Sequence, residues 1–195
     1  MLQKLKELKQ MIIEEKWKQN QIAAIDEIIT MEEEKIRKET AKNNKATNSR
    51  VACMQILNSR ICKQRPVLSK AKELSDGKIV LTDSYRLFLL NSNYNCLPLN
   101  DEEKDGKYPN VDGILKCASK INQITLPSIE ELKFLKKTKE EFIDLPDDEK
   151  YKMSVDFVLN MYGILGKNIT VYNNIKNIYI INDKNEVGIL MKAFK

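Results

Sequence analysis

The chain has 195 residues, of which 42% are hydrophobic and 31% are charged, and its formal net charge is +5. This composition suits a globular protein with a real core, and no stretch approaches the roughly 18 apolar residues that a membrane helix needs. Histidine is absent, which excludes Ser-His and Cys-His catalysis and the zinc sites that use histidine. Residues 1–10 lack the apolar centre of a signal peptide, so we expect a cytoplasmic protein without membrane contact.

The four cysteines are scattered, with no Cys-x-x-Cys pair: Cys53, Cys62, Cys96 and Cys117. In a cytoplasmic chain this spacing favours reduced, buried thiols over a disulfide or a metal site. The six glycines never cluster, so there is no phosphate-cradling loop. We therefore expect no metal, no cofactor and no catalytic residue.

The first 65 residues contain neither glycine nor proline, which predicts helix. Apolar residues recur at helical spacing in two runs, Leu5 to Ile12 and Ile22 to Ile36, and the phase is lost near residues 18–21. This pattern predicts either one bent helix or two helices with a tight join. The arm, residues 1–48 with its linker, either folds back as a hairpin, packs on the domain, or pairs with another copy through residues 1–45. Trp17 is its expected anchor.

Residues 49–195 are predicted to form one α+β domain. A helix over residues 50–62 is expected to end before Pro66, with strands over 67–74 and 78–82 joined by a turn at Asp76-Gly77. A polar corner follows at Thr82, Asp83, Ser84, Tyr85 and Arg86, and then an apolar run to residue 90. Asp83 and Arg86 are interpreted as a structural pair that holds this corner.

The second half has loops over 97–110 and 144–150, a short strand over 124–126, and a helix opened by the capping box of Ser128 and Glu131. A further helix over 154–165 should end at Gly166, before strands over 168–172, 177–181 and 187–194. The element order of residues 50–91 thus recurs in 154–194, which predicts two helix-plus-three-strand units.

Charge is distributed unevenly along the chain. Residues 40–72 contain no acidic residue and eight basic ones, so the remainder has a net charge of −3. Such asymmetry is typical either of a surface that binds a polyanion or an acidic protein partner, or simply of a solvated face in a lysine-rich chain. The first interpretation names these candidate nucleic-acid contacts: Arg50, Arg60, Lys63, Arg65, Lys70 and Lys72.

Four segments in this order resemble the bacterial DNA polymerase sliding clamp, or β subunit, family. They are Arg65-Pro66-Val67-Leu68, Gly77 to Thr82-Asp83-Ser84-Tyr85-Arg86-Leu87, Tyr108-Pro109-Asn110-Val111, and the final segment, residues 188–195. The resemblance covers residues 49–195. Within the family, this segment is most similar to the single clamp-like domains of phages and other mobile elements. It departs from the family at Lys192-Ala193, where a proline would be expected.

The resemblance implies a DNA-clamp-like domain with helices toward DNA and a hydrophobic peptide groove near the last strand. In this chain the groove wall would involve Leu190, Met191 and Phe194. The helix over 154–165 has Asp156 and no basic residue, so only the helix over 50–62 would favour phosphate contact.

Two functions from different classes follow. The first is a non-enzymatic, clamp-like module of a phage or mobile element, a replication accessory that binds DNA, RNA or protein. The second is a protein inhibitor of a host nucleic-acid enzyme, of the anti-CRISPR type, in which acidic loops at 101–105 and 144–149 mimic phosphates.

Overall fold

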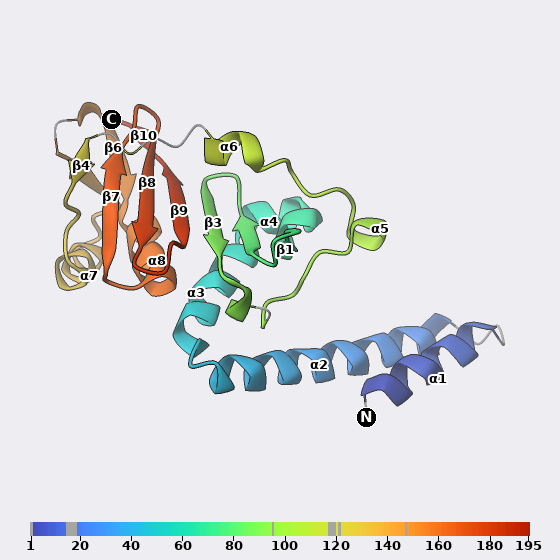
Figure 1. Cartoon of the computed structure of the whole chain (residues 1–195). Helices are drawn as coiled ribbons and strands as arrows, with labels where there is room; N and C mark the ends of the chain where they lie inside the picture. Colours follow the sequence, from blue (N-terminus) through green and yellow to red (C-terminus); the bar gives the residue numbers. More distant parts are fainter. Residues whose placement is uncertain (1, 15–18, 95, 117–119, 121, 147) are drawn as a thin grey trace. The chain divides into compact units, whose positions relative to one another are not determined.

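The structure is a computed structural model that describes residues 2–14, 19–94, 96–116, 120, 122–146 and 148–195 (Figure 1). The chain divides into two compact units, Met1–Thr47 and Asn48–Lys195.

The first unit is a helical hairpin. Helix α1 (Leu2–Glu14) lies antiparallel beside α2 (Gln19–Asn43), as Figure 1 shows. Lys6 Nζ lies 2.8 Å from Glu33 Oε1. Lys9 forms a second ion pair with Asp26, closer to the end of α1 and the start of α2. Of the alternatives open from the sequence, two helices folded back on each other are therefore present. Trp17 lies outside the described residues.

The second unit is a mixed α+β domain, as the sequence predicts. Its helices and 3-10 turns are α3 (Thr47–Leu57, which begins at the last residue of the first unit), α4 (Arg60–Gln64), η1 (Pro66–Ser69), η2 (Ser92–Tyr94), α5 (Glu102–Asp105), α6 (Asp112–Lys116), α7 (Ile129–Lys137) and α8 (Val155–Leu165). Its strands are β1 (Lys72–Glu73), β2 (Ile79–Thr82), β3 (Arg86–Leu90), β4 (Gln123–Ile124), β5 (Phe142–Leu145), β6 (Asp148–Ser154), β7 (Ile169–Asn173), β8 (Asn177–Asn182), β9 (Val187–Met191) and β10 (Ala193–Phe194).

The larger sheet has the order β1-β2-β3-β9-β8-β7-β4, with antiparallel neighbours throughout. The last strands of the two predicted units, β3 and β9, therefore pair at its centre, with Leu87 opposite Ile189 and Phe88 opposite Gly188. A Cβ at Gly188 would lie 3.1 Å from the Phe88 ring, so glycine lets this ring pack across the seam. Strands β1, β2 and β3 on one side of the seam and β7, β8 and β9 on the other run in mirrored order, and β4 adds one more strand beyond β7.

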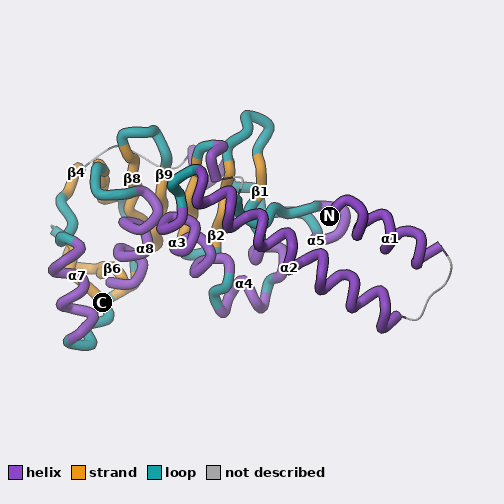
Figure 2. Tube along the Cα trace, turned by 90° about the horizontal axis from the view of Figure 1, so that it is seen from below, coloured by secondary structure: helices purple, strands orange, loops and turns teal. Residues whose placement is uncertain are grey.

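Both faces of this sheet are buried. One face packs on α3 and α8, which lie side by side in Figures 1 and 2, and a Cβ at Gly163 of α8 would come within 3.0 Å of Ala52 Cβ of α3. The other face packs on Cys62 of α4, Leu68 of η1 and the loop that carries Tyr108 and Val111. Strand residues alternate between the two cores, because successive side chains of a strand point to opposite faces.

Two helix boundaries agree with their sequence signals. Ser128 Oγ accepts from Glu131 N at 3.2 Å and Ser128 N donates to Glu131 Oε2 at 2.7 Å, so the capping box opens α7. Gly166 ends α8 at φ 83°, a left-handed conformation that glycine adopts without strain.

Two predictions near residue 60 were wrong. The helix over 50–62 is broken after Leu57, because Ser59 caps a new helix, α4, by accepting from Cys62 N at 3.3 Å. Residues 67–69 are not strand but 3-10 helix, since Pro66 fits the first position of such a turn and Ser69 Oγ donates to the Pro66 carbonyl at 2.6 Å.

The acidic segment 144–150 was wrongly predicted as a loop. Apart from Pro146, which lies in a turn, its described residues belong to β5 and β6, which form a separate sheet with the order β10-β6-β5. The expected single strand over 187–194 is divided between the two sheets, β9 in one and β10 in the other, with Lys192 at the change. The loop over 97–110 also contains the short helix α5.

Candidate functional site

The polar corner between β2 and β3 is held by one carboxylate. Asp83 Oδ1 accepts from the backbone N–H groups of Tyr85 (3.1 Å) and Arg86 (2.9 Å), and Ser84 N donates to Thr82 Oγ1 at 3.1 Å. Ser84 has φ 77°, an uncommon conformation for a residue other than glycine. These hydrogen bonds satisfy the backbone of the turn and fix the tight conformation at Ser84.

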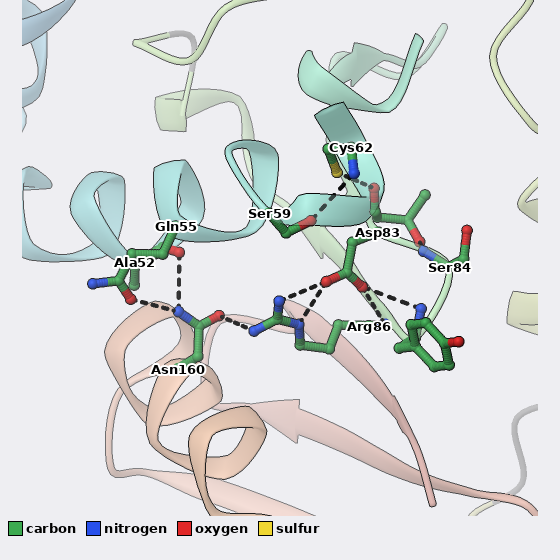
Figure 3. Close-up of polar contacts among 10 residues, drawn as sticks. Ala52, Gln55, Ser59, Cys62, Asp83, Ser84, Arg86 and Asn160 are labelled. Atoms are coloured by element: carbon green, nitrogen blue, oxygen red, sulfur yellow. Dashed lines mark hydrogen bonds and ion pairs between the residues drawn. The ribbon is translucent and has the colours of Figure 1, made fainter. Parts of the chain in front are cut away.

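Asp83 and Arg86 form the ion pair expected from the sequence. Arg86 Nε lies 3.0 Å from Asp83 Oδ2, and the side chains are only 10% and 3% exposed respectively. Arg86 Nη1 reaches Asn160 Oδ1 on α8 at 3.4 Å, and Asn160 Nδ2 donates to the Ala52 carbonyl on α3 at 3.1 Å (Figure 3). The pair therefore ties β3 to both helices of that face.

An apolar pocket of about 200 Å³ lies beside this corner, against the opposite face of the sheet. We call it the β9 pocket; its lining residues are Arg65, Thr82, Ser84, Tyr85, Arg86, Leu87, Pro109, Val111, Ile114, Ile189 and Met191. Four separate segments build it: Arg65 at the end of α4, the corner with the start of β3, the segment after Tyr108, and β9. Among the described residues, no acidic one lines it.

Strand alternation decides which residues of β9 reach the pocket. Ile189 and Met191 point to the pocket face, whereas Leu190 between them is fully buried in the core with α3 and α8. Of the residues predicted for a groove wall, the structure thus places Met191 at this pocket and Leu190 in the core. Phe194 lies elsewhere as well, because it belongs to β10 in the smaller sheet, is 74% exposed and stacks on Tyr151 with ring centroids 4.7 Å apart.

The segment after Tyr108 forms the second wall, which the sequence reasoning missed. Tyr108 is buried, and this burial raises the pKa of its phenol. The buried ring and Val111 anchor the loop, so that Pro109 and Ile114 face the pocket. Tyr108 and Pro109 belong to the sequence resemblance. A further signal for this wall is Ile114, an apolar residue of α6 that is 46% exposed.

The structure separates the six predicted nucleic-acid contacts. The prediction that Arg50 contacts nucleic acid is corrected, because Arg50 is buried. Its Nε donates to the Cys96 carbonyl at 3.2 Å, so its guanidinium is directed into the domain. Lys70 lies 2.8 Å from Asp105, and Lys72 lies 2.6 Å from Glu102. These lysines hold the pKa of Asp105 and of Glu102 below its ordinary value. Arg60, Lys63 and Arg65 are exposed.

The two acidic segments are also engaged within the domain. At α5, Asp101 pairs with Lys104 at 3.1 Å, besides the two pairs with Lys70 and Lys72. In the smaller sheet, Asp144 lies 2.9 Å from Lys195 and Asp148 lies 2.5 Å from Lys192. Phosphate mimicry by 101–105 or 144–149 would have to compete with these internal partners. Asp147 lies outside the described residues.

The described part of the chain contains no cluster of three or more His, Cys, Asp or Glu side chains that could hold a metal. Cys53, Cys62 and Cys96 are buried, free thiols, and burial raises the pKa of each. Cys117 lies outside the described residues. Within those residues, the chemistry that the site offers is binding through an apolar pocket with a basic rim.

No described helix is long and apolar enough to cross a bilayer. Comparisons with protein-family models, with curated proteins and with solved structures gave no match to this chain.

Proposed function

We propose that residues 48–195 form a non-enzymatic, clamp-like binding module, a replication accessory of a phage or mobile element, which holds a hydrophobic segment of a protein partner in the β9 pocket. The observation that carries the proposal is the pocket itself, with exposed Ile114 and Met191 at its edge and buried Ile189 and Val111 behind them. The sequence resemblance to sliding clamps, and the two mirrored units that meet at β3 and β9, support the clamp-like part.

The size of the pocket favours a side chain over a free cofactor. A cavity of about 150 Å³ is sufficient for benzene, whereas pockets for drug-sized ligands run from about 300 Å³ upward. At about 200 Å³, the β9 pocket matches one large apolar side chain, such as leucine or phenylalanine. Such an anchor in a desolvated pocket is the kind of contact that dominates protein interfaces.

The charged residues between Arg50 and Lys72 favour protein over nucleic acid as the partner. A duplex is bound by several lysines and arginines that neutralise phosphates together. Here Lys70 and Lys72 already have carboxylate partners, and Arg50 is buried. Three of the six predicted contacts are thereby engaged inside the domain.

The proposal predicts a selectable peptide ligand. Short random peptides displayed on phage and panned against the full chain should yield sequences with a leucine or phenylalanine anchor. Binding of the selected peptides, measured by fluorescence anisotropy, should fall by more than about tenfold in Met191→Glu, because the carboxylate would lie against apolar walls.

The matched control is Ile175→Glu, which places the same charge on an isoleucine that is 81% exposed in the turn between β7 and β8. It should leave peptide affinity unchanged. A library that yields no peptide, or peptides that bind the Met191 variant as well as the wild type, would refute the proposal.

A further inference from the structure

The exposed basic residues Arg60, Lys63 and Arg65 differ from their neighbours in having no carboxylate partner in the part of the chain that the structure describes. Lys70 and Lys72, only a few residues further on, each form an ion pair of 2.8 Å or less. Helix α4 and the residue after it therefore present positive charge that the domain itself does not neutralise.

Arg65 brings this charge to the pocket. It lines the β9 pocket together with Ser84, and its Nη1 donates to Ser84 Oγ at 3.1 Å. A guanidinium has five N–H donors in a planar fork, and the Ser84 hydroxyl occupies one of them. The tight turn at Ser84 therefore holds Arg65 over the pocket and leaves most of its donors for a ligand.

The other polar groups of the pocket do not offset this charge. Arg86 also lines it, but its guanidinium is matched by the Asp83 carboxylate, so that the pair adds no net charge. The remaining lining is uncharged: Thr82 and Tyr85 are polar, and the rest is apolar, as at Leu87, Pro109 and Ile189. The site is thus an apolar floor with one unmatched cation at its edge.

Building on the proposed function, we infer that the partner segment carries a carboxylate next to its apolar anchor, and that Arg65 selects it. The planar fork of arginine suits a carboxylate, which it binds through two parallel hydrogen bonds. The carboxylate belongs either to an aspartate or glutamate side chain or to the end of the partner chain, and the test below separates these sources.

The test repeats peptide selection on the full-length wild type, on Arg65→Gln and on Lys167→Gln. Lys167 is a matched control because it is 72% exposed and does not line the pocket. We expect the wild type and Lys167→Gln to enrich peptides that have aspartate, glutamate or a free carboxyl end beside the anchor. Arg65→Gln should select the same anchors without that enrichment.

Affinities then quantify the contact. For the best wild-type peptide, Arg65→Gln should weaken binding about fivefold, the upper range for a partly exposed ion pair. For its Asn/Gln counterpart the two proteins should bind alike, and comparison of free-acid with amidated peptide assigns the carboxylate. Apolar peptides selected without any carboxylate preference would overturn this inference alone, whereas a selection that yields no peptide overturns the proposed function as well. Displacement of the peptide by a DNA duplex only in proteins that retain Arg65 would assign the cation to phosphate, and also overturn the inference.

Discussion

Arg86 is a charged residue that the fold has placed almost entirely out of water. Its guanidinium lies between the Asp83 carboxylate and Asn160 and also stacks over the Phe157 ring, 4.5 Å from the centroid. A buried charge of this kind is tolerated because its partners replace the lost hydration. The consequence is that loss of either partner leaves an uncompensated charge.

We therefore expect Asp83→Asn to lower the free energy of unfolding by about 3 kcal/mol, the low end of the range for breaking a buried ion pair. Urea denaturation followed by circular dichroism measures this difference. Lys136→Gln, which breaks the exposed Lys136–Asp156 pair of 2.6 Å, should cost less than about 1 kcal/mol. Equal costs for the two variants would show that the buried pair has no special weight.

At this scale the sequence predicted local pairs well and burial poorly. The Asp83–Arg86 pair could be predicted because the residues are three apart in one turn. The burial of Arg50 could not be predicted, since its hydrogen-bond acceptor, the Cys96 carbonyl, is 46 residues away in the sequence. The same holds for Lys70, whose partner Asp105 comes from a segment that looked like an unrelated acidic loop.

Among the elements, the change from β9 to β10 depends on one lysine. The side chain of Lys192 is 1% exposed, forms an ion pair with Asp148 and lies over the Tyr151 ring, 5.2 Å from its centroid. This contact draws the chain out of the larger sheet just after Met191, and so fixes the edge of the β9 pocket. The sequence pattern alone predicts one continuous strand across Lys192, because the strand is ended by a contact of Lys192 with β6 and not by a local sequence pattern.

This contact should make stability depend on pH. Burial favours the neutral form of Asp148, but the Lys192 ammonium and the backbone N–H groups of Tyr151 and Lys150 outweigh it, so the pKa of this carboxyl lies below its ordinary value. A lowered native pKa stabilises the fold above about pH 4, the unfolded value, and the stabilisation is lost as the pH falls through the native value.

Urea denaturation at a series of pH values should therefore show Asp148→Asn less stable than the wild type near neutral pH, with a difference that shrinks below about pH 4. Asp144→Asn, which removes an exposed carboxylate from the neighbouring strand, serves as the control and should show little pH-dependent difference. A constant difference across the series would assign the effect of Asp148→Asn to packing.

The elements that local signals predicted are those with caps or alternation. The start of α7 and both ends of α8 were predicted within one residue because Ser128, Glu131 and Gly166 act locally. Strand β1 is far shorter than predicted, since Pro66 and Ser69 close a 3-10 turn over residues that are apolar enough for a strand.

For the molecule as a whole, the helical hairpin raises the question of self-association. On α2, Ile28 and Met31 are 49% and 67% exposed, and on α1 Leu8 is 46% exposed. Exposed apolar residues at helical spacing are typical of helices that pair with a partner. Association of two copies through residues 1–45 stays a prediction from the sequence. The exposed apolar residues of the hairpin are consistent with it.

Light scattering of the full chain should then give a molar mass above that of one copy, and Ile28→Glu combined with Met31→Glu should return it to the monomer value. Ile175→Glu adds a charge to the second unit and should leave the assembly intact. A monomeric wild type would refute self-association and with it any closed ring.

The central pairing of β3 with β9 has a consequence for how the second unit can be made. Each half on its own would expose a long central strand edge and an apolar face that only the other half covers. Two polypeptides obtained by cutting the chain between α6 and β4 should therefore recombine into one functional protein. Because the β9 pocket takes its walls from both halves, a reporter peptide bound there would signal that recombination.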